Sequence, residues 1–273
     1  MPLKNVILII LFSVSFPALA QSIGSPKLEI FEIEAPGLDT LRTIRVHLPV
    51  DYSDSEEKYP VLYMHDAQNL FDTATAFAGE WQVDEFMEAQ KGQKLIVVGI
   101  DHGNEKRISE LTPFPNEKYG GGEGAAYVHF LVNTLKPHID STYRTLPEAE
   151  NTAVAGSSLG GLISFYSALT YPEKIGKVGV FSPSFWFSEK IFDFAEAAQI
   201  PENSRFYFVG GAAESEEMVA HLMKMKQILL RQGVLEENLK VKLVEDGQHN
   251  EAFWSREFPE AFQWLFPDDE GQK

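Results

Sequence analysis

A serine enclosed by glycines is the residue of this sequence best placed to do chemistry. The stretch NTAVAGSSLGGLISFY contains Gly156-x-Ser158-x-Gly160. An apolar run precedes the motif and a helical pattern follows it, which is the strand–turn–helix context of a nucleophile elbow. Side chains at the two glycine positions would collide in so sharp a turn, and the serine oxygen then projects at the carboxyl edge of a sheet. We therefore predict that Ser158 is a nucleophile.

A serine hydroxyl is a poor nucleophile until a general base takes its proton. In this context the chain order is serine, acid, histidine, and two histidines follow Ser158. His221 lies inside the predicted helix 215–232. His249 lies in a loop directly after the last predicted strand, so we predict that His249 is the base. His65 and His102 precede the serine and are candidates for lining the pocket.

The acid that orients the histidine should follow the strand predicted at residues 205–211. Glu214 is the first acidic residue after that strand, so it is our first choice. Glu216 is the close alternative, and Asp193 is a more remote one. The glutamate that is not used would stabilise a helix N-terminus.

An oxyanion hole requires two preorganised N–H groups. One is expected from Leu159, the residue after the nucleophile. The other is expected from the loop DAQNLFD that follows the strand YPVLYMH. We place it at Gln68, with Ala67 as the alternative.

Short apolar segments alternate with helical patterns from residue 59 to the end, which predicts an α/β fold with a mostly parallel central sheet and helices on both faces. Two alternating segments near the N-terminus predict antiparallel strands that precede it. The predicted strands cover 27–34, 41–49, 59–65, 94–100, 151–157, 177–182, 205–211 and 240–246, and clear helical stretches cover 124–139, 159–171, 215–232 and 257–265. Residues 108–124 form one long irregular segment, either a loop over a site or a connection.

The composition and the N-terminal segment indicate which partners and which localisation to expect. The chain has 273 residues, a net charge of -17 and no cysteine, which disfavours nucleic acid and anionic membrane surfaces as partners. Val6–Phe16 is an apolar run too short to span a bilayer comfortably, and Ala18-Leu19-Ala20 suits a signal peptidase. We expect residues 1–20 to be a signal peptide and residues 21–273 to be one periplasmic or secreted domain without a membrane span.

Several stretches resemble those of a known family, the α/β-hydrolases named “putative esterase”, which include esterase D, feruloyl and acetyl xylan esterases, enterochelin-type siderophore esterases and the mycolyltransferase antigens. The stretches that carry the resemblance are YPVLYMHDAQNLFD, GEWQVDE, LKPHIDSTYRT, AVAGSSLGGLISFYSALTYPEKIGKVGVFSPSFW and GQHNEAFWSREFPEAFQWLF. The resemblance implies an α/β-hydrolase fold and serine esterase chemistry. It supports Ser158 and His249, and the backbones of Gln68 and Leu159. The family often has glycine where this chain has Ala67.

Aromatic residues after the strand at 177–182 are candidates for the substrate wall. Phe185 and Trp186 are predicted to bind substrate, and Trp81 and Trp254 are further candidates. We expect Arg107 either to pair with Glu110 or to meet a substrate carboxylate.

The predicted function is hydrolysis of a carboxylic ester, of a siderophore or of a carbohydrate-linked ester, through an acyl-enzyme. The mechanism calls for no metal or organic cofactor, and no HExxH or similar spacing predicts a metal site. An acyltransferase that uses the same triad and a catalytically silent binding domain are the alternatives. The sequence does not indicate an oligomeric state.

Overall fold

The computed structural model describes residues 27–90 and 92–267. The predicted signal peptide, residues 1–20, lies outside them. No helix in the described part of the chain has both the length and the apolar character needed to cross a membrane.

One eight-stranded sheet organises the described residues, in the order β1-β2-β4-β3-β5-β6-β7-β8. Its strands are β1 (Leu28–Ala35), β2 (Thr40–His47), β3 (Val61–His65), β4 (Ile96–Ile100), β5 (Thr152–Ser157), β6 (Lys177–Phe181), β7 (Arg205–Gly211) and β8 (Leu239–Val244). β1 pairs with β2, and β2 with β4, in antiparallel fashion, whereas every pair in the remaining order β4-β3-β5-β6-β7-β8 is parallel. The predicted mostly parallel sheet with antiparallel N-terminal strands is therefore confirmed.

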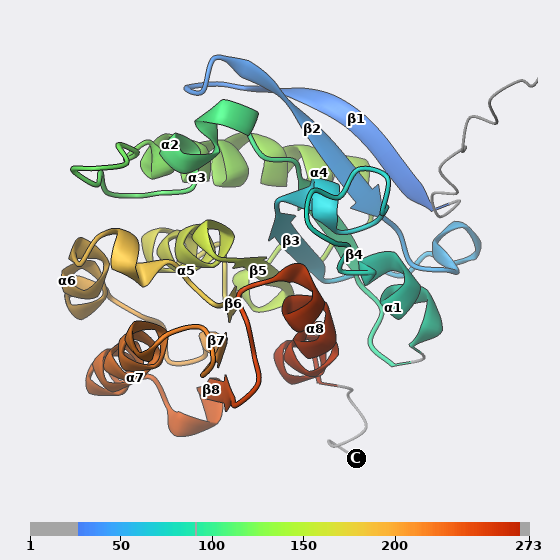
Figure 1. Ribbon diagram of the computed structural model, residues 1–273. Helices are drawn as coiled ribbons and strands as arrows, with labels where there is room; N and C mark the ends of the chain where they lie inside the picture. The colour runs from blue at the N-terminus through green and yellow to red at the C-terminus, as the bar shows by residue number, and fades with distance from the viewer. Residues whose placement is uncertain (1–26, 91, 268–273) are drawn as a thin grey trace, which may run out of the picture.

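Helices cover both faces of this sheet (Figure 1). They are α1 (Val83–Ala89), α2 (Arg107–Glu110), α3 (Gly124–Phe130), α4 (Lys136–Thr142), α5 (Leu159–Thr170), α6 (Lys190–Ala197), α7 (Glu216–Arg231) and α8 (Glu251–Leu265). Figure 1 shows α1 and α8 on one side of the sheet, and α3, α4, α5 and α7 on the other.

The alternation of side chains along each strand divides the core into two apolar layers. In β3, Val61 and Tyr63 belong to the layer under α3 to α7, while Leu62 and Met64 belong to the layer under α1 and α8. Successive strand residues point to opposite faces, and both faces are buried here, so the strand is apolar throughout. The layers hold the carboxyl ends of the parallel strands at one edge of the sheet.

Two helices differ from their predicted bounds by more than one residue. The stretch predicted as a helix at 124–139 runs through α3, a π-helical turn at Leu131–Leu135 and α4. The helix predicted at 257–265 begins at Glu251, because the Asn250 side chain accepts a hydrogen bond from the Phe253 N–H at 2.9 Å and caps it.

Candidate active site

Ser158 occupies the sharp turn between β5 and α5. Its backbone has φ 57° and ψ -119°, a strained conformation for a residue with a side chain. A Cβ atom on Gly156 would lie 2.8 Å from the carbonyl carbon of Gly160. The turn therefore closes because Gly156 has no side chain, as the motif predicts for that position.

His249 lies in the loop between β8 and α8 and reaches Ser158. Its Nε2 is 3.0 Å from Ser158 Oγ. Trp254, from the first turns of α8, places its ring at 5.0 Å from the imidazole, edge to face. The His249 side chain is 42% exposed, so a substrate can approach the pair from solvent.

Glu214 completes a chain of hydrogen bonds behind His249. Its Oε2 is 2.7 Å from His249 Nδ1, and its Oε1 accepts from Ser182 Oγ at 2.6 Å and from the Gly211 N–H at 2.8 Å. Burial raises the pKa of this carboxyl, but the three hydrogen bonds outweigh burial and hold the pKa below its ordinary value.

The two alternative acids lie on helices and do not contact His249. Glu216 is the first residue of α7, where its charge faces the positive end of the helix dipole. Asp193 is in the first turn of α6. The structure thus places Glu214, our first choice, beside the histidine.

The sequence analysis did not predict the supporting contacts of three residues, Trp254, Ser182 and Ser184. Trp254 Nε1 donates to Ser182 Oγ at 2.9 Å, so the same indole supports both the imidazole and the carboxylate. Ser184 Oγ lies 3.1 Å from Ser158 Oγ. Both serines follow β6, the strand beside β5, so adjacency of strand ends was the signal that could have identified them.

The two residues predicted to donate N–H groups to the oxyanion lie in neighbouring segments, the start of α5 and the turn after β3. Leu159 is the first residue of α5, where the N–H has no acceptor within the helix. Gln68 is in the 3₁₀ turn Ala67–Asn69 that follows β3. A Cβ atom on Gly160 would lie 3.4 Å from Asp66 Oδ2 and 3.3 Å from the Cβ of His65, so the start of α5 packs against the start of this turn.

Arg107 does not pair with Glu110, so the first of the two expectations for Arg107 is wrong. Its guanidinium makes two hydrogen bonds to Asp66, at 2.7 and 2.8 Å. Glu110 instead pairs with Arg42 at 2.7 Å. Arg107 and Glu110 both lie in the short helix α2, but they meet partners from different strand ends. The Arg107 guanidinium is already hydrogen-bonded to Asp66, the residue before the turn that carries Gln68, so Arg107 holds this turn in place.

His65, at the end of β3, is buried beside this pair. Its Nδ1 is 2.8 Å from the Tyr127 hydroxyl, and its Nε2 makes no hydrogen bond with any described residue. Burial lowers the pKa of the imidazole to about 4, and the charge of Asp66 opposes that shift only in part. His65 is therefore neutral near pH 7.

The predicted aromatic wall is only partly present. Phe185 is fully buried and packs on Phe165 with ring centroids 5.5 Å apart, so its prediction as a substrate-binding residue is wrong. Trp81 and Trp254 are each 4% exposed and belong to the core. Trp186 is 44% exposed.

Trp186 has an aromatic partner from the long irregular segment at 108–124. Tyr119, which is 45% exposed, packs edge-on against it at 5.8 Å. The Asn116 side chain donates to the Phe187 carbonyl at 2.6 Å and anchors the segment there. The segment thus forms part of the exposed aromatic surface at Trp186, which follows Ser184 by two residues in the sequence.

A polar pocket of about 770 Å³ is lined by residues of β2 and of the segments that follow β3 and β4, and Gln68 is one of its lining residues. Arg45, His102 and Lys106 are among its lining residues. Ser158 and His249 are not among its lining residues, so Gln68 is what relates this pocket to the predicted site.

One group of carboxylates with the spacing of a metal site occurs among the described residues. It consists of Glu80, Asp84 and Glu85, at the N-terminus of α1, and none of the three takes part in the hydrogen bonds around Ser158.

Residues 35–265 match the protein family described as “Putative esterase”. YbbA of Bacillus subtilis (strain 168) is 26% identical over 238 residues, 82% of this chain and 92% of that protein. The endo-1,4-beta-xylanase/feruloyl esterase of Xylanibacter ruminicola is 27% identical over 235 residues, 83% of this chain but 29% of that protein. The iron(III) salmochelin esterase of Escherichia coli O6:H1 is 24% identical over 230 residues, 78% of this chain and 51% of that protein.

A solved structure has the same fold. The crystal structure of the BES protein from Bacillus cereus superimposes with a TM-score of 0.72 at 19% identity, and the match covers 92% of this chain and 99% of that one. The sheet is thus that of an α/β-hydrolase. With the family match over most of its length, the chain belongs to the “Putative esterase” family and is an enzyme that hydrolyses esters.

Proposed function

We propose that this enzyme is a serine esterase in which Ser158, His249 and Glu214 form the catalytic triad. The observation that carries the proposal is the continuous chain of hydrogen bonds from Ser158 Oγ through both imidazole nitrogens to the Glu214 carboxylate, at 3.0 and 2.7 Å. This is the geometry that lets a histidine take the serine proton while a carboxylate stabilises the imidazolium.

The reaction proceeds in two halves. His249 Nε2 removes the hydroxyl proton of Ser158, whose oxygen attacks the ester carbonyl, and the N–H groups of Leu159 and Gln68 bind the oxyanion. His249 then gives the proton to the departing alcohol, which leaves an acyl group on Ser158. A water molecule, deprotonated by His249, hydrolyses that acyl-enzyme and restores the serine.

The substrate is an ester with an aromatic portion, of the siderophore or the carbohydrate-linked feruloyl type. The exposed rings of Trp186 and Tyr119 offer an aromatic surface, and the polar pocket that Gln68 helps to line suits hydroxyl groups. The names of two relatives, a feruloyl esterase and a salmochelin esterase, support this class.

An active-site probe tests the triad directly. Incubation with a fluorophosphonate followed by intact mass measurement should give one adduct on the wild type, none on Ser158→Ala, and much slower labelling of His249→Ala. Ser184→Ala is the matched control, since its hydroxyl lies 3.1 Å from that of Ser158 and its loss should leave the labelling site unchanged. Absence of an adduct on well-folded wild type would overturn the proposal and favour a silent binding domain.

We also infer that residues 1–20 direct export and are removed, which leaves residues 21–273 as one esterase domain. Support comes from the apolar run Val6–Phe16 and the small residues Ala18 and Ala20. A mature N-terminus at Gln21, read by mass spectrometry from the exported fraction, is the expected result. Retention of residues 1–20 would contradict it.

A further inference from the structure

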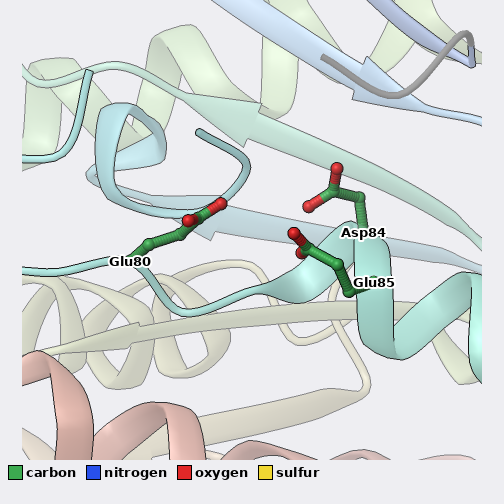
Figure 2. A group of neighbouring side chains, drawn as sticks. All are labelled: Glu80, Asp84 and Glu85. Carbon is green, nitrogen blue, oxygen red and sulfur yellow. The ribbon is translucent and has the colours of Figure 1, made fainter. Parts of the chain in front are cut away.

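Three carboxylates converge where the chain enters α1. Figure 2 shows Glu80, from the loop before the helix, and Asp84 and Glu85, from its first turn, with their side chains pointing toward one another. Each contributes an oxygen atom, and these oxygens lie within 4.8 Å of one another. Three like charges this close repel strongly, so the arrangement needs a compensating feature.

Among the residues that the structure describes, no cationic side chain compensates this charge. Asp84 is 5% exposed, and its Oδ1 is buried with no hydrogen-bond partner. No described lysine, arginine or histidine forms an ion pair with any of the three carboxylates. A buried carboxylate without a partner is costly, and such a group deserves an explanation.

We propose that Glu80, Asp84 and Glu85 bind one calcium ion. Carboxylate oxygens are the ligands that Ca²⁺ prefers, at about 2.4 Å, so an ion placed among them can bridge oxygens up to about 4.8 Å apart. Mg²⁺, at about 2.1 Å, would require the carboxylates to draw closer together. Glu85 is exposed, so water can complete the coordination from the solvent side.

One further observation agrees with a cation at this place. Thr73 Oγ1 donates to Glu80 Oε2 at 2.5 Å, which leaves the other oxygen of Glu80 available as a ligand.

The ion would stabilise the turn that carries Gln68. The Trp81 N–H donates to the Asn69 carbonyl at 2.8 Å, and the Val83 N–H donates to the Leu70 carbonyl at 3.0 Å. Residues 80–85 are therefore tied by backbone hydrogen bonds to the segment that follows β3. Calcium at this site has a structural role, and it takes no part in the reaction at Ser158.

Thermal unfolding of the full chain tests this inference. After treatment with a chelator, 1 mM CaCl₂ should raise the Tm of the wild type by roughly 5 °C, the shift expected for a ligand at about 100 times its Kd. Asp84→Asn and Glu85→Gln should abolish the shift. Glu85 is exposed, so its variant keeps the test valid if Asp84→Asn fails to fold. Glu236→Gln/Glu237→Gln, which removes two neighbouring exposed acids elsewhere, should retain the full shift.

Direct binding provides a second readout. Tb³⁺, a luminescent substitute for Ca²⁺, should bind one equivalent per chain, be excited through the nearby Trp81, and be displaced by Ca²⁺. Glu85→Gln should lose this signal, whereas the Glu236→Gln/Glu237→Gln control should keep it. An unchanged Tm on adding CaCl₂, an equal shift in Glu85→Gln, or a larger shift with MgCl₂ than with CaCl₂ would each overturn the proposal.

Discussion

Glu214 and Asp84 are two buried carboxylates that the fold treats in opposite ways. Glu214 sits behind His249 and receives three hydrogen bonds, from the imidazole, from Ser182 and from the Gly211 backbone. Asp84 sits in the first turn of α1, and its Oδ1 has no partner among the described residues. The pKa of Glu214 is held below its ordinary value despite burial, whereas that of Asp84 is raised to about 7.

The difference lies in the donors around each carboxylate rather than in the extent of burial. Desolvation is the leading influence on both groups and raises both pKa values. At Glu214 the donors come from the ends of β6 and β7 and from the loop after β8, which meet at one edge of the sheet. At Asp84 the neighbours are Glu80 and Glu85, which add negative charge. The first site is complete within the chain, and the second calls for a cation.

Removing the charge of Glu214 should have the largest effect. An amide in Glu214→Gln cannot stabilise an imidazolium as a carboxylate does, and its NH₂ group would face donors that need an acceptor. We expect kcat/KM to fall about 10³-fold or more with KM little changed, measured on a short aryl ester.

Glu216→Gln is the matched control, since it removes an equal charge two residues away at the start of α7. It should retain activity within about twofold. A loss in Glu216→Gln as large as in Glu214→Gln would show that the triad acid is misassigned.

Replacing Arg107 would remove the partner of another buried carboxylate, that of Asp66, and leave it unpaired as Asp84 is. Asp66 is 8% exposed and is neutralised by two hydrogen bonds from Arg107. In Arg107→Met, an uncompensated negative charge remains beside the start of α5, where we propose that the oxyanion is bound. We expect kcat to fall roughly 10- to 100-fold in steady-state assays, because the charge opposes the developing oxyanion.

The double variant Asp66→Asn/Arg107→Met separates charge from structure. Asn tolerates the left-handed conformation that Asp66 adopts, with φ 56°, and removes the unpaired charge. It should recover most of the kcat lost in Arg107→Met. A double variant as slow as Arg107→Met would show that Arg107 acts through packing rather than through neutralisation.

The sheet, and the close approach of Ser158, His249 and Glu214, could be predicted because they depend on local patterns. Gly156, Ser158 and Gly160 are read from a five-residue motif, and His249 and Glu214 from their positions after predicted strands. The structure places Glu214 against His249 rather than Glu216, because the helix begins at Glu216 and Ser215 caps it. Position along the chain was enough to order these candidates.

The partners of Arg107 and the burial of Phe185 could not be predicted from such patterns. Arg107 and Glu110 are three apart in sequence, so a local pair was expected, but each meets a charge from a different strand end. Phe185 and Trp186 are adjacent, yet one is buried in the core and the other exposed. The orientation of a short 3₁₀ turn decides this, and it depends on tertiary packing.

The smallest effect is expected from His65, and it is an effect on stability. His65 is a buried base, and it can be compared with the buried carboxylates of Glu214 and Asp84. Its Nε2 is unpartnered among the described residues, like Asp84 Oδ1, and Tyr127, Asp66 and Arg107 are the polar groups that face it. Burial lowers its pKa to about 4 in the folded protein, while in the unfolded chain it takes a proton near pH 6.5. The unfolded state therefore binds more protons between these values, and stability falls as the pH decreases from about 6.5 to 4.

His65→Asn removes this titration while its amide can still meet the Tyr127 hydroxyl. Urea unfolding at pH 7.5 and pH 5 should show that the wild type loses about 2 kcal/mol more than the variant, since each pH unit below 6.5 contributes about 1.4 kcal/mol. The advantage of the wild type over His65→Asn should thus shrink on acidification. If the difference in free energy of unfolding between the wild type and His65→Asn stays constant between the two pH values, His65 acquires its proton in the folded state. Its unpartnered nitrogen would then cost the fold little, unlike the carboxylate of Asp84.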